Sequence, residues 1–125
     1  MQNNLVRLNS DGSIDNGFDP GSSTNTAIFS MDTAGDGSGD IFIGGSFVLY
    51  NGDTVGRFAR IRNDGSLHTT YGGDLPVFDG LVNSIVKAID GSGEMYFGGA
   101  FDSYVTDSTQ TMEGVGRLNS SGNAN

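Results

Sequence analysis

The sequence predicts an all-β protein made of antiparallel β-meander repeats of about 54 residues. An apolar run occurs twice, as IFIGGSF at 41–47 and as MYFGGAF at 95–101. Turns rich in Asp, Gly and Ser separate the apolar runs, and glycine suits such turns because it accepts positive φ without steric cost. No window shows the i, i+3, i+4, i+7 apolar spacing that an amphipathic helix requires. Together these observations favour short strands over helices along the whole chain.

Length and charge limit the domain number and the kinds of partner that this protein can have. The 125 residues fit a single repeat domain, 1–125. Fifteen Asp and Glu against six Lys and Arg give a net charge of −9, so the basic footprint that nucleic acids and anionic membranes require is missing. There is no cysteine for disulfides or thiolate metal sites, and no apolar run approaches the ~20 residues of a membrane span. We expect no nucleic-acid partner and no membrane insertion.

The first short strand is predicted at 5–8 (LVRL), followed by a turn at 9–13. This strand-turn element returns at 58–66 and again at 115–122, with its arginine at Arg7, Arg60 and Arg117. The connecting loop at 14–21 is matched by 67–73, where one aromatic residue lies near glycine. These three copies establish the alignment of the repeats along the chain.

Each repeat continues with two further strands. The segments 27–32 and 82–90 are rich in β-branched and apolar residues, which favours strands. A hairpin turn follows at 35–40 and at 90–94, and it leads into the apolar run described above. The sequence therefore predicts blade-like units at about 27–63 and 81–121.

The apolar run at 41–47 has apolar residues at successive rather than alternating positions, so both faces of this strand are expected to be buried. One small antiparallel sheet cannot bury both faces, whereas sheets stacked face to face can. The pairs Gly44-Gly45 and Gly98-Gly99 are costly inside a strand unless a bulge is present or another backbone comes close. A plain strand end is the alternative.

The order of these motifs resembles the delta-60 repeat family, which forms bacterial β-propeller blades. The resemblance is carried by RLNSDGSID at 7–15, the Asp-Gly-Ser-Gly hairpin, IGGSF at 43–47 and RFARI at 57–61, and it covers residues 5–122. It implies two complete copies and a partial one. The arginine at the start of the last motif is replaced by Asn4 and Gly114 in the outer copies, which weakens the match there.

Two blades cannot close a propeller, which usually has about four to eight. The chain is therefore expected to join other copies of itself or further blades of a larger assembly. The strand at 5–8 corresponds to the last strand of a blade, so it is a candidate to complete a blade in a neighbouring subunit. A two-blade piece in a stacked β assembly that is not a propeller is the alternative.

The turn before the apolar run is the best metal candidate. Asp32, Asp36 and Asp40 place carboxylates in a Gly-rich loop, loosely like a calcium loop. No Glu arrives at position 12 as in an EF-hand, so an ordinary hairpin turn is the competing interpretation. Calcium is the one cofactor considered, and otherwise none is expected.

The loops 48–56 and 102–116 differ in length between copies, which favours display to a partner over a role in the core. The candidate partner-binding residues in them are Tyr50, Asn51, Asp53, Tyr104 and Asp107. Aromatic rings beside short polar side chains suit sugar binding, although pinning of loops explains the rings as well.

We interpret the chain as a non-enzymatic structural or recognition module of β-propeller type, extracellular, on a cell surface or on a virus particle. Its partners would be other blades and a glycan or surface protein. No nucleophile elbow or phosphate loop is present, and His68 is the single histidine. A carbohydrate-binding or polysaccharide-degrading propeller domain is the alternative.

Overall fold

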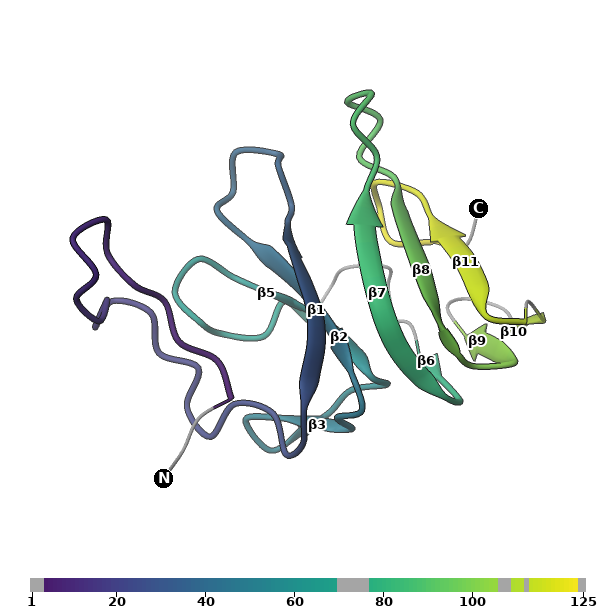
Figure 1. Cartoon of the computed structure of the whole chain (residues 1–125), viewed down its shortest axis with the longest axis horizontal. Helices are drawn as coiled ribbons and strands as arrows, with labels where there is room; N and C mark the ends of the chain where they lie inside the picture. The colour runs from purple at the N-terminus through teal and green to yellow at the C-terminus, as the bar shows by residue number, and fades with distance from the viewer. Residues whose placement is uncertain (1–3, 70–76, 106–108, 112, 124–125) are drawn as a thin grey trace.

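The computed structural model describes residues 4–69, 77–105, 109–111 and 113–123, and every regular element in them is a β-strand. The two larger sheets stand side by side (Figure 1). The first sheet has the order β1-β2-β5 and the second the order β11-β8-β7. Their strands are β1 (Ile28–Thr33), β2 (Ile41–Gly45), β5 (Phe58–Ile61), β7 (Leu81–Lys87), β8 (Met95–Ala100) and β11 (Val115–Leu118). The predicted all-β fold of antiparallel, blade-like sheets is confirmed.

The five remaining strands are short and lie at the ends of the larger sheets. A two-stranded hairpin joins β3 (Leu49–Tyr50) to β4 (Asp53–Thr54). A small three-stranded sheet has the order β10-β9-β6, from β6 (Val77–Phe78), β9 (Ser103–Val105) and β10 (Thr109–Thr111). A parallel bridge between Gly56 and Val77 connects the two halves of the chain.

The glycine pairs occur where the predicted bulge lies. The β1–β2 register shifts between Ile28 and Ser30, opposite Gly45 and Gly44. A Cβ on Gly45 would lie 2.2 Å from the backbone oxygen of Ala27, and one on Gly44 would lie 2.7 Å from Val82 Cγ1 in the second sheet. Both reasons expected for the glycines, a bulge and a close approach, are therefore present.

The two sheets are joined by a core of aromatic rings. Phe58 of β5 is fully buried, stacks on Phe42 at 5.7 Å between ring centroids and meets Phe97 of β8 edge-on at 5.1 Å. Phe78 extends the cluster to Phe101 at 4.9 Å. Such edge and offset contacts add to the stabilisation from burial. β2 is accordingly buried from Phe42 to Gly45, as predicted for a strand covered on both faces.

Polar contacts between β1 and β7 fix the register of the two sheets. Ile85 donates its backbone N–H to Ser30 Oγ at 3.1 Å, and Lys87 donates its own to Asp32 Oδ2 at 3.0 Å. The first sheet therefore presents side-chain acceptors to the free backbone edge of the second.

Residues 4–18 form an N-terminal arm beside the first sheet (Figure 1, purple). The arm is a hairpin in which Leu8 bridges Ile14 and Asp15 donates its N–H to Arg7 O at 2.9 Å. Leu5 and Phe18 are buried and pack in a second core with Ile43 of β2. Within the described residues, the strand predicted at 5–8 pairs only within its own hairpin.

Candidate functional site

The Asp-rich turn before β2 is organised by an arginine. Arg60 donates from Nε to Asp40 Oδ2 at 2.7 Å and from Nη2 to Asp36 Oδ2 at 2.8 Å. Arg60 and Asp40 are buried, at 8% and 6% exposure, whereas Asp36 is half-exposed. Hydrogen bonds from the Ser38 hydroxyl and backbone N–H, then from Arg60, hold the pKa of Asp36 well below its usual range.

The three carboxylates predicted to bind calcium have separate tasks. Asp36 and Asp40 hold Arg60, while Asp32 accepts the backbone N–H of Lys87 across the sheet interface. No group of three or more His, Cys, Asp or Glu side chains that could hold a metal occurs in the described part of the chain. In the described residues the three carboxylates do not come together as the ligand set that the sequence suggested, and the positive charge beside Asp36 and Asp40 is that of Arg60.

Tyr50 was predicted to face a partner, and this is wrong. The side chain is fully buried, and its hydroxyl donates to the backbone oxygen of Gly65 at 2.6 Å. Burial raises the pKa of Tyr50. The ring anchors the β3–β4 hairpin to the turn after β5. This agrees with the alternative explanation of the loop aromatics, in which they hold loops in place.

Tyr104 is also buried, so its predicted surface role is wrong. It is 1% exposed and stacks on Phe78 at 5.3 Å between centroids. Gly116 leaves room for it, because a Cβ there would lie 2.8 Å from Tyr104 Cε1. Asp107, predicted in the same loop, lies outside the described residues.

Asn51 and Asp53 lie at the surface, and their role in binding a partner stays a prediction. Asn51 has a φ of 48°, and its Oδ1 accepts the backbone N–H of Ser22 at 3.1 Å. Both side chains are exposed. Asn51 therefore shapes the turn, and the Asp53 carboxylate is the more accessible group for a partner.

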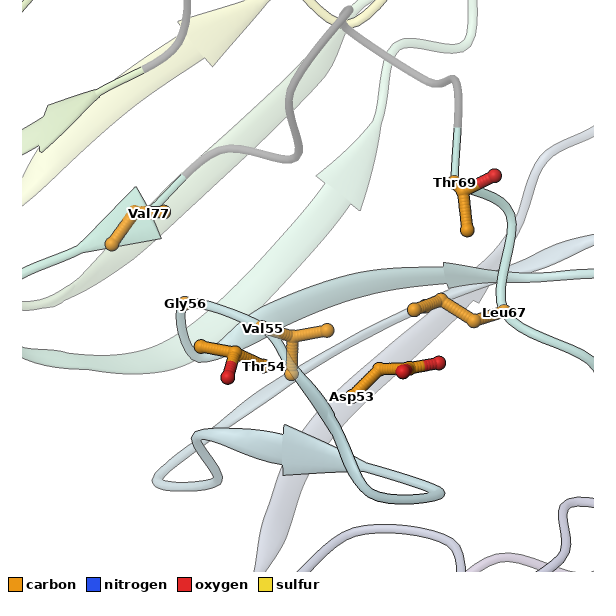
Figure 2. Close-up of a pocket in the computed structure, with 7 residues that line it drawn as sticks. All are labelled: Asp53, Thr54, Val55, Gly56, Leu67, Thr69 and Val77. Carbon is orange, nitrogen blue, oxygen red and sulfur yellow. The ribbon is translucent and has the colours of Figure 1, made fainter.

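Asp53 lines a surface cavity of about 460 Å³ beside the β3–β4 hairpin (Figure 2). In the view of Figure 2, Val77 lies at the left, Leu67 and Thr69 lie at the right, and residues 53–56 lie between them. The lining mixes carboxylate and hydroxyl groups with apolar side chains: Asp53, Thr54, Val55, Gly56, Leu67, Thr69 and Val77. Such a mixture can bind a polar ligand without a metal.

The described carboxyl groups with shifted pKa values are all shifted downward. The serine hydroxyl and backbone N–H two residues further on lower the pKa of Asp11, Asp36, Asp64 and Asp90. Backbone N–H groups are the largest cause of the lowered pKa of Asp15 and Asp79. A general acid for glycoside cleavage needs the opposite shift. Burial lowers the pKa of His68.

Among the described residues, nothing stacks on one face of the second sheet. By repeat position, Tyr96 and Val115 correspond to Phe42 and Phe58, which are buried between the sheets. Tyr96 is 42% exposed and Val115 is 60% exposed, and Val86 beside Tyr96 is also exposed. The second apolar run therefore differs from the first, since no described sheet covers its outer face.

The recurring arginine marks the period of the repeat in the sequence, and in the structure it also forms an ion pair that the sequence did not predict. Arg60 pairs with Asp40, which precedes β2, and Arg117 pairs with Glu94, which precedes β8, at 3.5 Å. The signal was present in the sequence as an acid directly before each apolar run. Spacing alone does not reveal that the acid and the arginine lie on neighbouring strands.

The family model of a domain of unknown function (DUF5122), described as a β-propeller, matches residues 2–18 and 37–71. The chain is similar to β-propeller repeats. The match covers less than half of the chain and, with the antiparallel sheets, supports a β-propeller repeat family. No curated protein and no solved structure matches significantly. No helix with the length and hydropathy of a membrane span occurs in the described residues.

Proposed function

We propose that the chain is a non-enzymatic scaffold of β-propeller type, built from two complete delta-60 repeats and a partial one. It would join other copies or blades and present its loops to a partner. A rigid stack of this kind suits an extracellular place, on a cell surface or on a virus particle. The observation that carries the proposal is the aromatic core between two stacked sheets, combined with the uncovered face of the second.

The stacking already present in the chain supports a binding mode for a further blade. The first sheet buries Phe42 and Phe58 against the second sheet. The uncovered face presents Tyr96 and Val115 at the same repeat positions, with Val86 beside them. Exposed apolar side chains gathered on one sheet face mark an interaction surface.

The cavity beside the β3–β4 hairpin is the proposed display site. Asp53, Thr54 and Thr69 supply hydrogen-bonding groups, and Val55 and Leu67 supply apolar surface. A glycan or a surface protein is the proposed ligand class. The β3–β4 hairpin beside the cavity is anchored by Tyr50, so that binding would not require ordering of the hairpin.

A carbohydrate-binding or polysaccharide-degrading domain is the second candidate. The polar lining of the cavity favours the binding form of this candidate. The lowered pKa values of Asp15, Asp64 and Asp79 do not favour the degrading form, because these groups are ionised at neutral pH.

The proposal is tested by the mass of the purified chain in solution, measured by light scattering. We expect a defined multiple of the chain mass, which Val86→Asp on the uncovered face reduces to a monomer. Ile89→Asp is the matched control, because Ile89 is fully exposed beyond the end of β7. A folded monomer at all concentrations, or equal effects of the two variants, refutes the assembly.

A further inference from the structure

The N-terminal arm repeats β5 in sequence and in position. Arg7 corresponds to Arg60, so Leu5 corresponds to Phe58. Phe58 packs on Phe97 of the following sheet, and Leu5 packs in one cluster with Ile43, the repeat counterpart of Phe97. The arm therefore lies on the first sheet as β5 lies on the second. By repeat position the arm corresponds to the third strand of a larger sheet, and the described residues contain no first or second strand beside it.

The arm has a backbone edge that no described strand pairs with. Arg7 O accepts the N–H of Asp15, so the Arg7 backbone faces the hairpin side. Because backbone groups alternate along a strand, the N–H and C=O groups of Val6 and Leu8 face the opposite side. In β5 the same alternation holds: Arg60 O accepts His68 N–H at 2.9 Å, and β5 pairs with β2 along its other edge.

An apolar groove runs along this edge. It has a volume of about 160 Å³ and lies between the arm and the first sheet. Val6 and Met31 on its walls are 59% and 53% exposed. The residues that line it are Leu5, Val6, Arg7, Phe18, Met31, Gly39 and Ile41. The groove therefore offers apolar contacts beside a free strand edge.

The charges indicate which strand fits. In each of the two larger sheets, an acid directly before the middle strand pairs with the arginine of the third strand, as in Asp40–Arg60 and Glu94–Arg117. Arg7 is the third arginine of this series, and its side chain is 35% exposed. Its acid partner is Asp15 of its own hairpin, and its Nη1 donates to Asn63 in the turn after β5. No acid that precedes a middle strand pairs with it among the described residues.

We propose that the arm and the first sheet form an acceptor for a β-strand of the β2 type. The occupant is an extended segment with an acid followed by successive apolar residues and Gly-Gly, and it pairs antiparallel with residues 5–8. Its backbone bonds Val6 and Leu8, its acid meets Arg7, and its apolar side chains fill the groove. This is strand addition to a free sheet edge.

The first glycine of the occupant is required by the strand β1 over which it would pass. Gly44 of β2 passes over Val82 of the second sheet, and a Cβ would come within 2.7 Å of it. Ile28 and Met31 hold the positions of Val82 and Ile85 in the first sheet. A larger residue in place of this glycine would therefore prevent docking.

The inference rests on the proposed scaffold role, since it names one strand that a further blade supplies. The probe is a fluorescein-labelled peptide with the sequence of residues 36–47, titrated with the purified chain and followed by fluorescence anisotropy. The chain is kept below the concentration at which light scattering detects association. We expect saturable binding, about tenfold weaker for Val6→Pro, which removes one N–H from the free edge. Ile14→Ala, on the hairpin side of the arm, is the control and leaves binding unchanged.

Two peptide variants test the same contacts without altering the protein. Gly44→Val in the peptide abolishes binding, and Asp40→Lys weakens it about tenfold or more. No saturable binding, or equal affinity for the Gly44→Val peptide, overturns the inference. A chain that associates in solution but does not bind the peptide overturns this inference alone. A monomeric chain that binds the peptide overturns the proposed assembly alone.

Discussion

Phe58→Ala tests whether the two sheets form one cooperative core. The ring is fully buried, stacks on Phe42 and meets Phe97 of the other sheet. Loss of a buried Phe with the cavity left behind costs about 3–5 kcal/mol of the free energy of unfolding. For a chain of this size this lowers Tm by roughly 10–20 °C. Phe29→Ala is the matched control, because Phe29 of β1 is 48% exposed, and it should cost less than about 1 kcal/mol.

The assay is urea unfolding of both variants, followed by circular dichroism and by tyrosine fluorescence. We expect one transition that shifts as a whole in Phe58→Ala, because the ring contacts both sheets. Equal destabilisation by the two substitutions refutes the burial argument. Two transitions, only one of which moves in Phe58→Ala, refute the common core.

Three further predictions use the same measurement. Gly44→Ala lowers the free energy of unfolding by about 1–3 kcal/mol through overpacking. Gly98→Ala is tolerated, because its Cβ would meet only one atom within 4 Å, at 3.8 Å. Equal losses of stability in the two variants contradict the overpacking argument. Asp40→Ala costs about 3 kcal/mol because it leaves the buried Arg60 with one carboxylate fewer, and a cost below about 1 kcal/mol contradicts the buried pair. The pKa of Asp36 is lower in the folded than in the unfolded state, so its stabilisation is present above about pH 4 and is lost as the pH falls further. Asp36→Asn should therefore flatten the acid dependence of the free energy of unfolding, and an unchanged slope contradicts the assignment.

Predicted surface roles were wrong where an aromatic ring could either be displayed or pin a loop. Tyr50 and Tyr104 were assigned to display loops from their polar neighbours, but both are buried. The sequence offers the same composition for the two outcomes. Whether the ring is buried depends on a partner that is distant in sequence. The backbone oxygen of Gly65 accepts a hydrogen bond from the Tyr50 hydroxyl, and Gly116 leaves space for the Tyr104 ring.

The Asp-rich turn shows that local sequence also does not predict the partner of a charged side chain. Carboxylates in a Gly-rich loop predict either a cation site or a hairpin turn, and local sequence does not separate the two. Arg60 lies 20 residues beyond Asp40, and only the antiparallel pairing of β2 with β5 brings them to 2.7 Å. The cation beside these carboxylates is therefore a side chain of the neighbouring strand.

The sequence by itself determined the period, the strand class and the antiparallel meander, because these depend on local propensity, turn chemistry and repetition along the chain. It also placed the Gly44-Gly45 pair at a bulge or close approach, since glycine inside a strand is costly without such a reason. Only the tertiary structure decided which sheet face is covered, as the buried Phe42 and its exposed counterpart Tyr96 show. The physical reason is that burial depends on which surfaces meet in space, and equivalent positions of two repeats differ once one has a neighbouring sheet and the other has none among the described residues.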